Sequence, residues 1–347
     1  MSVAGEYEKF VWKRISFGIF SLLLLLSLSA IALSLGSYEI PLKELLREIS
    51  GGNPVLWNVR IPRILTAILV GSSLALSGAV MQCILRNPLA SPFTLGISQA
   101  AAFGAAVAIV FFGLGKMHRV GESLTIFNPY AVPIFAFLGS LISAFVILAL
   151  AKLRDLSPEA IILAGVAMSA LFQAFVMLIQ YFATDVQVAS IVFWTFGDVG
   201  RARWIEIYII LVTFFLCSLY FFYRRWDYNA LLAGDETAIS LGVNPQKVRL
   251  EGMLVSSFLT AVCVSFTGII GFIGLIAPHV VRLVIGGDYR FLIPNCAIIG
   301  AIILLISDTV GRTIISPVII PVGIITSILG APMFIYLLLR GGRSAGG

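Results

Sequence analysis

The sequence predicts an all-α polytopic membrane protein with about ten transmembrane helices, because a helix that crosses a ~30 Å hydrocarbon core needs roughly 20 apolar residues. Three observations predict this class. Hydrophobic residues make up 59% of the 347 positions and charged residues 12%, and the mean hydropathy is +1.04. Apolar runs of spanning length repeat along the whole chain. Most charged residues fall between these runs, as expected for membrane helices. The composition lies outside the usual range of soluble globular proteins.

The apolar runs set the expected order of the spans. They cover residues 15–35, 62–84, 93–113, 129–151, 159–181, 204–223, 252–268, 270–286, 292–311 and 321–339. The first run follows Lys13 and Arg14 as a signal peptide would, but its length and the later spans favour a membrane helix. We expect a single transmembrane domain over residues 1–347.

The distribution of Lys and Arg predicts the orientation. If the N-terminus is cytoplasmic, the cytoplasmic segments hold the larger share of the 23 Lys and Arg residues, as the positive-inside rule requires. Both termini are then cytoplasmic. The net charge of +6 does not indicate nucleic-acid binding, because the basic residues are scattered over the loops. Several outer arginines run against this bias.

Asn-Pro and Ser-Pro pairs recur between the runs. Asn and Ser can cap a helix, and proline suits its first position. Each pair therefore predicts a helix start: Asn87-Pro88, Ser91-Pro92, Asn128-Pro129, Ser157-Pro158, Asn244-Pro245 and Ser316-Pro317. The two pairs within residues 86–92 predict a sharp cytoplasmic turn followed by a new helix, and an ordinary tight turn is the alternative.

Three connections predict local structure. Residues 41–49, PLKELLREI, have the apolar spacing of an amphipathic interfacial helix. Residues 183–203, which include FWTFGD, predict a short re-entrant or interfacial helix. Residues 224–252 predict two or three short cytoplasmic helices, because Gly234, Asp235 and Gly242 suit helix ends.

The cytoplasmic insertion at about residues 227–250 predicts a docking surface. No separate domain is present to bury its apolar residues, and exposed apolar patches mark interaction sites. A loop without a partner is the alternative. The candidate docking residues are Leu231, Leu232, Ile239 and Leu241.

Few ionisable side chains lie inside the expected spans, among them His279, Arg282 and Asp308. A proton-coupled carrier normally needs an intramembrane carboxylate relay, so an ion-coupled carrier is disfavoured. The chain has no H-E-x-x-H or G-x-S-x-G motif and no paired carboxylates, which disfavours an enzyme. It also lacks the G-x-x-x-x-G-K-[ST] phosphate loop, so ATP hydrolysis would require a separate subunit.

Cysteine and histidine predict no metal site and no bound cofactor. Cys83, Cys217, Cys263 and Cys296 fall singly within apolar runs, and their spacing is not that of metal ligands. His279 alone is a poor ligand set. We expect helix packing or polar contacts for all of them.

Six segments resemble the permease subunits of the iron-siderophore, haem and vitamin B12 ABC importers. They are RIPR (60–63), SGAVMQCILRNPLASPFTLGIS (77–98), ILAGVA (162–167), GIIGFIGLIAPHVVR (268–282), SDTVGR (307–312) and PVGIITSILGAPMFIYLLL (321–339). The resemblance implies a type II ABC importer permease fold and a homodimer with the path along its axis. It also implies two cytosolic ATPases that bind ATP and Mg, an extracytoplasmic binding protein, and the cytoplasmic membrane of a prokaryote.

The resemblance implies a cytoplasmic gate. Asn87 and Leu89 match gate residues of the vitamin B12 permease, and Ser157 and Pro158 match a second gate segment. This chain departs from the B12 permease there, since it has Ser-Pro-Glu in place of Ser-Thr-Ser.

The resemblance also implies an outer docking site. Arg60, Arg63 and Arg312 match arginines that face acidic residues of the binding protein, and guanidinium groups suit paired carboxylates. Contact with lipid headgroups is the alternative. Ile319 stands where many members have a glutamate.

The expected function is import of a metal chelate by alternating access, with the chain as the permease. A ferric siderophore is the first expectation for the cargo, followed by vitamin B12 or haem. Some relatives move small oxyanions, so molybdate or tungstate stays an alternative. A passive or ion-coupled carrier without an ATPase is the alternative class.

Overall fold

The computed structural model describes residues 3–36, 40–41, 43–113, 117–120, 123–126 and 130–341. In chain order the helices are α1 Val3–Ser34, α2 Leu45–Ser50, α3 Ile61–Ile84, α4 Ile97–Phe111, α5 Ala131–Lys152, α6 Pro158–Phe182, α7 Asp185–Thr195, α8 Trp204–Tyr223, α9 Arg225–Leu232, α10 Asp235–Ser240, α11 Pro245–Thr267, α12 Ile273–Ile285, α13 Tyr289–Thr313 and α14 Val322–Gly341. A π-helical turn, Leu56–Arg60, leads into α3, and a 3-10 turn, Val199–Arg201, precedes α8. One antiparallel hairpin, β1 Met117–Val120 with β2 Ser123–Ile126, contains the only strands in these ranges. The predicted all-α class is confirmed.

Seven helices in the described part of the chain are long and apolar enough to cross a membrane. They are α1, α5, α6, α8, α11, α13 and the continuous helix Leu56–Ile84, which contains α3. Shorter apolar segments are α4 (Ile97–Phe111), α12 (Ile273–Ile285) and the Val322–Met333 part of α14. Each expected span corresponds to one of these helices. However, α4 and α12 have 15 and 13 residues, fewer than the roughly 20 that cross the hydrocarbon core alone.

The helix that contains α3 lies inside the bundle and is the most buried of the seven long helices, since 83% of the residues in its most apolar stretch are buried. It packs against α11, α12 and α13. A Cβ atom on Gly71 would lie 2.4 Å from the Gly300 carbonyl oxygen, and one on Gly78 would lie 1.9 Å from the Gly274 carbonyl oxygen. Small residues let membrane helices approach closely, so these two crossings fix α3 against α13 and α12.

Two of the predicted Asn-Pro and Ser-Pro helix starts are confirmed. The Ser157 hydroxyl accepts a hydrogen bond from the Ala160 amide at 3.3 Å, and α6 begins at Pro158. The Asn244 side chain accepts from the Lys247 amide at 3.0 Å, and α11 begins at Pro245. These side chains satisfy amides that have no partner within the helix.

The other described pairs do not begin a long helix. The Ser91 hydroxyl accepts from the Thr94 amide at 3.2 Å, as an N-cap would, but it caps a single turn, and α4 begins only at Ile97. The predicted start at Asn87-Pro88 is wrong, because this pair lies in a turn. Ser316-Pro317 also lies in a turn, before α14 begins at Val322. Asn128-Pro129 lies outside the described residues, as does Leu42 of the predicted interfacial helix. The short helices α2, α7, α9 and α10 lie within the connections where short helices were expected.

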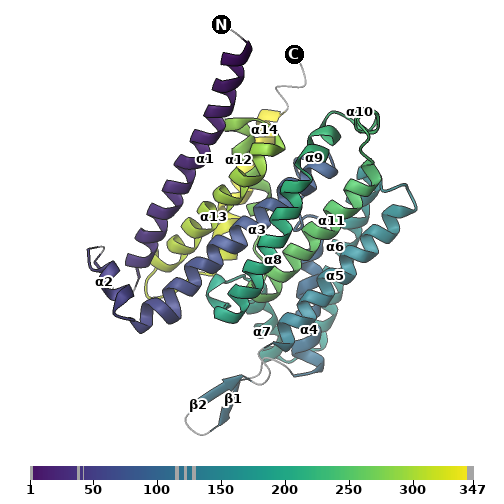
Figure 1. The fold of residues 1–347 in the computed structure, drawn as a ribbon. Helices are drawn as coiled ribbons and strands as arrows, with labels where there is room; N and C mark the ends of the chain where they lie inside the picture. The colour runs from purple at the N-terminus through teal and green to yellow at the C-terminus, as the bar shows by residue number, and fades with distance from the viewer. Residues whose placement is uncertain are drawn as a thin grey trace.

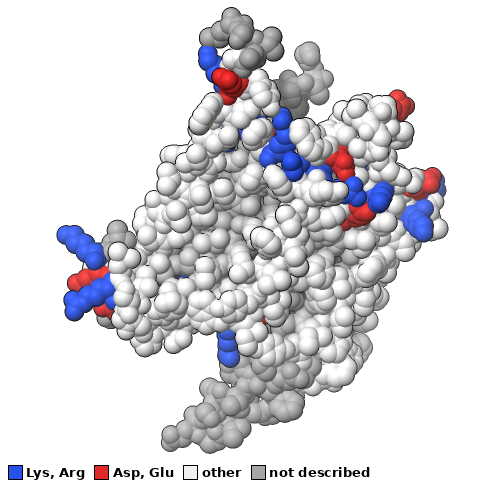
Figure 2. Space-filling view, viewed as in Figure 1, with Lys and Arg blue, Asp and Glu red and all other residues white. Residues whose placement is uncertain are grey.

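The two ends of the bundle differ in what they carry (Figure 1). The start of α1, α9, α10 and the visible end of α14 lie at one end, and α2, α7 and the hairpin lie at the other. We call these the inner and outer ends, after the orientation predicted by the charges. In the same view, charged side chains gather toward the two ends and uncharged residues form the broad surface between them (Figure 2). This distribution fits a bundle that crosses a membrane.

Candidate functional site

The turn after α3 carries two of the predicted gate residues. The Arg86 amide donates to the Cys83 carbonyl at 3.1 Å and the Asn87 amide donates to the Gln82 carbonyl at 3.2 Å. This pair of bonds ends a helix in a Schellman motif. The Asn87 side chain then accepts from the Leu89 amide at 2.9 Å. Asn87 therefore stabilises a local turn instead of capping a helix, which explains the wrong prediction at Asn87-Pro88.

Both predicted gate segments lie at the inner end, but only Ser157 and Pro158 of the four predicted gate residues line a cavity there. Leu89 is 40% exposed and Asn87 is half-buried. A cavity of about 840 Å³ is lined by Arg86, Ser157, Pro158 and residues of the coupling insertion. Asn87 and Leu89 are not among its lining residues. Within one chain, the structure thus places Arg86, which was not predicted, beside the second gate segment.

The coupling insertion folds into α9 and α10, and it exposes three of its four candidate docking residues. Leu232, Ile239 and Leu241 are 48%, 63% and 66% exposed. The prediction that Leu231 is exposed is wrong, since this side chain is completely buried in the main hydrophobic core. Tyr228, one helical turn earlier, is also buried, so this face of α9 attaches the insertion to the bundle.

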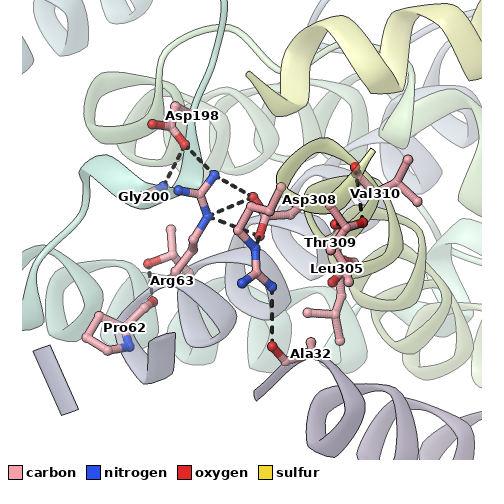
Figure 3. A network of polar contacts seen from close by, with 12 residues as sticks. Ala32, Pro62, Arg63, Asp198, Gly200, Leu305, Asp308, Thr309 and Val310 are labelled. Carbon is pink, nitrogen blue, oxygen red and sulfur yellow. Dashed lines mark hydrogen bonds and ion pairs between the residues drawn. The ribbon is translucent and has the colours of Figure 1, made fainter. Parts of the chain in front are cut away.

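The outer arginines form contacts within the chain (Figure 3). Arg63 donates to Asp308 through Nε and Nη2 at 2.9 and 2.8 Å, and to Asp198 through Nη2 at 3.0 Å. Arg312 Nε donates to the other Asp308 oxygen at 3.1 Å. The side chains of Arg63, Arg312 and Asp308 are only 9%, 8% and 1% exposed. Two arginines and two aspartates thus balance their charges, and the network joins α3 to α13.

Other outer arginines stabilise the ends of helices. Arg60 Nη1 donates to the carbonyls of Leu33 and Ser34 at 2.5 and 3.1 Å, at the end of α1. Arg201 donates to the carbonyls of Phe193 and Trp194 near the end of α7. Burial lowers the pKa of Arg201, and the nearby Asp198 opposes this shift. Cations at carbonyl ends of helices are favourable, which gives these arginines a structural reason to depart from the positive-inside bias.

The candidate metal ligands remain isolated in the described structure. His279 Nε2 is buried and has no hydrogen-bond partner among the described residues. The part of the chain that the structure covers contains no group of three or more His, Cys, Asp or Glu that could hold a metal ion. All four cysteines are buried and unpaired. The described residues around these positions therefore provide packing but no ligand set for a metal.

A known protein family matches most of this chain. The family model described as the FecCD transport family matches residues 22–340. The chain belongs to the FecCD transport family. The resemblance seen in the sequence is thereby confirmed, and the chain is a component of membrane transport.

Relatives and a solved structure support this family assignment over nearly the full length. A protein of Methanocaldococcus jannaschii, provisionally named as an ABC transporter permease, is 58% identical over 345 residues, with 98% of this chain and 99% of the relative covered. The hemin transport system permease of Yersinia pestis is 37% identical, with 92% of this chain and 94% of the relative covered. A structure provisionally described as an inward-facing metal-chelate type ABC transporter matches with a TM-score of 0.81 and 32% identity, covering 94% and 99% of the two chains.

Proposed function

We propose that the chain is the permease of an ATP-driven importer that moves a metal chelate into the cell by alternating access. The cargo class is supported by one relative and one solved structure: the permease named for hemin and the structure described as a metal-chelate type transporter. A ferric siderophore, cobalamin or haem fits this class. The chain supplies the path, and ATP and Mg bind to a separate subunit.

The observation that carries this proposal is the arrangement of the inner end. The exposed apolar residues Leu232, Ile239 and Leu241 belong to the same insertion that lines a cavity with Ser157 and Pro158 of the second gate segment. An exposed apolar group on a cytoplasmic loop fits burial by a partner protein. An ATPase bound there would lie next to the segments that it has to move.

The proposal includes the assembly implied by the family resemblance. Two copies of this chain form a homodimer around the path, two cytosolic ATPases bind the coupling insertions, and an extracytoplasmic binding protein delivers the cargo. The whole chain acts as one permease domain in the cytoplasmic membrane of a prokaryote, with both termini in the cytoplasm. In Figure 1 the start of α1, α9, α10 and the end of α14 lie at one end, which supports placing both termini on the side of the coupling insertion.

Docking of the binding protein through Arg60, Arg63 and Arg312 stays a prediction. The side chains of Arg63 and Arg312 are paired with Asp308, and Arg60 binds the end of α1. Contact with carboxylates of a binding protein would therefore require these internal contacts to open.

The alternatives differ in cargo or in energy source. An oxyanion importer would use the same fold to carry molybdate or tungstate. An ion-coupled or passive carrier would work without an ATPase. Asp308, the acidic residue near the outer end of α13, already binds Arg63 and Arg312. It is therefore a poor proton relay, which favours the ATP-driven importer.

Uptake into proteoliposomes tests both cargo and energy. The permease, its ATPase and its binding protein are reconstituted together, and uptake of a ferric siderophore, haem, cyanocobalamin, molybdate and tungstate is measured with and without ATP. We expect uptake of one metal chelate only when ATP and all three proteins are present. Selective uptake of an oxyanion would change the cargo assignment. Uptake by the permease alone down a gradient would replace the importer with a carrier.

A further inference from the structure

One carboxylate connects the coupling insertion to the turn that carries the predicted gate residues. Asp235 is the first residue of α10. One of its oxygens accepts a hydrogen bond from Arg86, and its two oxygens accept from Arg249 Nη2 at 2.6 and 2.8 Å. The N-cap of α10 is Gly234, and no side chain caps the helix. The Asp235 side chain therefore serves contacts between segments that are distant in the sequence.

The two arginines also bind the backbone of neighbouring helices. Arg249, on α11, donates through Nε to the carbonyl of Ile84, the last residue of α3, at 3.1 Å. Arg86 donates through Nε to the carbonyl of Leu231, in the last turn of α9, at 3.2 Å. The ends of α3 and α9, the start of α10 and the body of α11 are thus connected through one group of three side chains.

The backbone at Arg86 shows that this side chain occupies an unfavourable position. Its φ angle is +46°, in the left-handed region that glycine adopts at the end of a Schellman motif. An arginine there is strained where glycine is not. Strained residues persist where surrounding contacts hold them, and they gather at functional sites. Here the contacts are those to Asp235 and Leu231, and the residues that follow are Asn87 and Leu89.

We propose that Asp235, Arg86 and Arg249 transmit movement of the ATPase-bound insertion to the gate turn. This inference rests on the proposed function. When a bound ATPase displaces α9 and α10, the contacts to Asp235 and Leu231 move Arg86, and Arg86 moves Asn87 and Leu89. In this proposal the three side chains are positioning residues, which act through the contacts that they make with one another and with the backbone. Removing the connection should leave the ATPase bound but the gate turn insensitive to nucleotide.

Accessibility of the gate turn tests this inference without knowledge of the cargo. Leu89→Cys is introduced into the permease and the complex with its ATPase is purified. The native cysteines are buried, so a polar maleimide should label position 89 selectively. Labelling rates are compared without nucleotide and with ATP plus vanadate. We expect two different rates in the parent complex. In Arg86→Gly and in Asp235→Asn the two rates should become equal, with the ATPase still bound in parental amount.

Arg86→Gly separates coupling from folding, because glycine suits the backbone there and should leave the turn folded. Lys13→Gln is the matched control: it removes an exposed cation from the inner part of α1, outside the coupling insertion, and it should keep the nucleotide response. Arg86→Lys, which keeps the charge, should keep part of it.

Three outcomes overturn the inference. A full nucleotide response in Arg86→Gly would show that the connection is not needed. Loss of the ATPase from this variant would make Arg86 a docking residue. If labelling of position 89 responds to nucleotide in neither the parent nor the variants, the gate turn is not controlled by ATP and the inference is overturned, whereas the ATP-driven function is decided separately by the uptake experiment.

Discussion

Each end of the bundle contains an aspartate that binds two arginines, but the two aspartates differ in burial. At the outer end the Asp308 side chain is 1% exposed, and its partners Arg63 and Arg312 are 9% and 8% exposed. At the inner end Asp235 and Arg86 are 38% and 37% exposed, and only Arg249 is buried. A buried charge that loses its partner is costly, whereas exposed ion pairs contribute little. We infer that Asp308 mainly holds the fold together, whereas the exposed contact between Asp235 and Arg86 can move with little effect on stability.

The largest expected effect is therefore at Asp308. Asp308→Asn keeps the side-chain shape but leaves the buried Arg312 without a carboxylate and the buried Arg63 with Asp198 alone. We expect a loss of about 3–5 kcal/mol in the free energy of unfolding, measured as a lower midpoint of thermal unfolding of the purified permease in detergent. Asp198→Asn is the control, since Asp198 is 30% exposed and binds only Arg63 in this network. Equal midpoints for the two variants would remove the distinction based on burial.

The second effect concerns docking at the inner end. Leu232→Asp places a charge on an exposed apolar position of α9 and should cost about 2 kcal/mol of ATPase binding or more, the range of an interface hot spot. That is roughly a 30-fold loss of affinity, measurable by co-purification of the ATPase. Leu46→Asp is the control, because Leu46 is 79% exposed on α2 at the outer end. Undiminished binding by Leu232→Asp would place the ATPase elsewhere.

The smallest expected effect on stability is at Arg86. Arg86→Gly removes a half-exposed ion pair, whose contribution is at most about 1 kcal/mol, and relieves a strained backbone. The midpoint of thermal unfolding should stay close to the parental value and depend less on salt than that of the parent protein, because salt screens exposed pairs. A drop as large as that of Asp308→Asn would mean that the inner connection also holds the fold together.

The sequence predicted the features that depend on neighbouring residues. The apolar runs located the spans, and Ser157 and Asn244 cap helices as expected. The prediction failed at Asn87 because its side chain accepts a hydrogen bond from the Leu89 amide within a turn and does not cap a helix. Leu231 and Leu232 are adjacent in the sequence, and only the packing of α9 decides that the first is buried and the second exposed.

The ion networks could not be predicted, because their members are distant in the sequence. Arg63 and Asp308 are separated by 245 positions, and Arg86 and Asp235 by 149. The outer arginines that depart from the positive-inside bias were a real signal, but this signal did not distinguish contacts within the chain from docking of a partner. The positive φ angle of Arg86 is visible only in the structure, and no residue pattern indicates it.

Cross-linking at Leu89 tests the central claim most directly, namely that the inner end is an ATP-controlled gate between two copies of the chain. Leu89→Cys is placed in the complex with the ATPase, and a short bifunctional maleimide is added without nucleotide and with ATP plus vanadate. Leu46→Cys at the outer end is the control. We predict cross-linked dimers through position 89 in a yield that changes with nucleotide, and no such change at position 46. Absence of cross-links through position 89 in both states would contradict the claim.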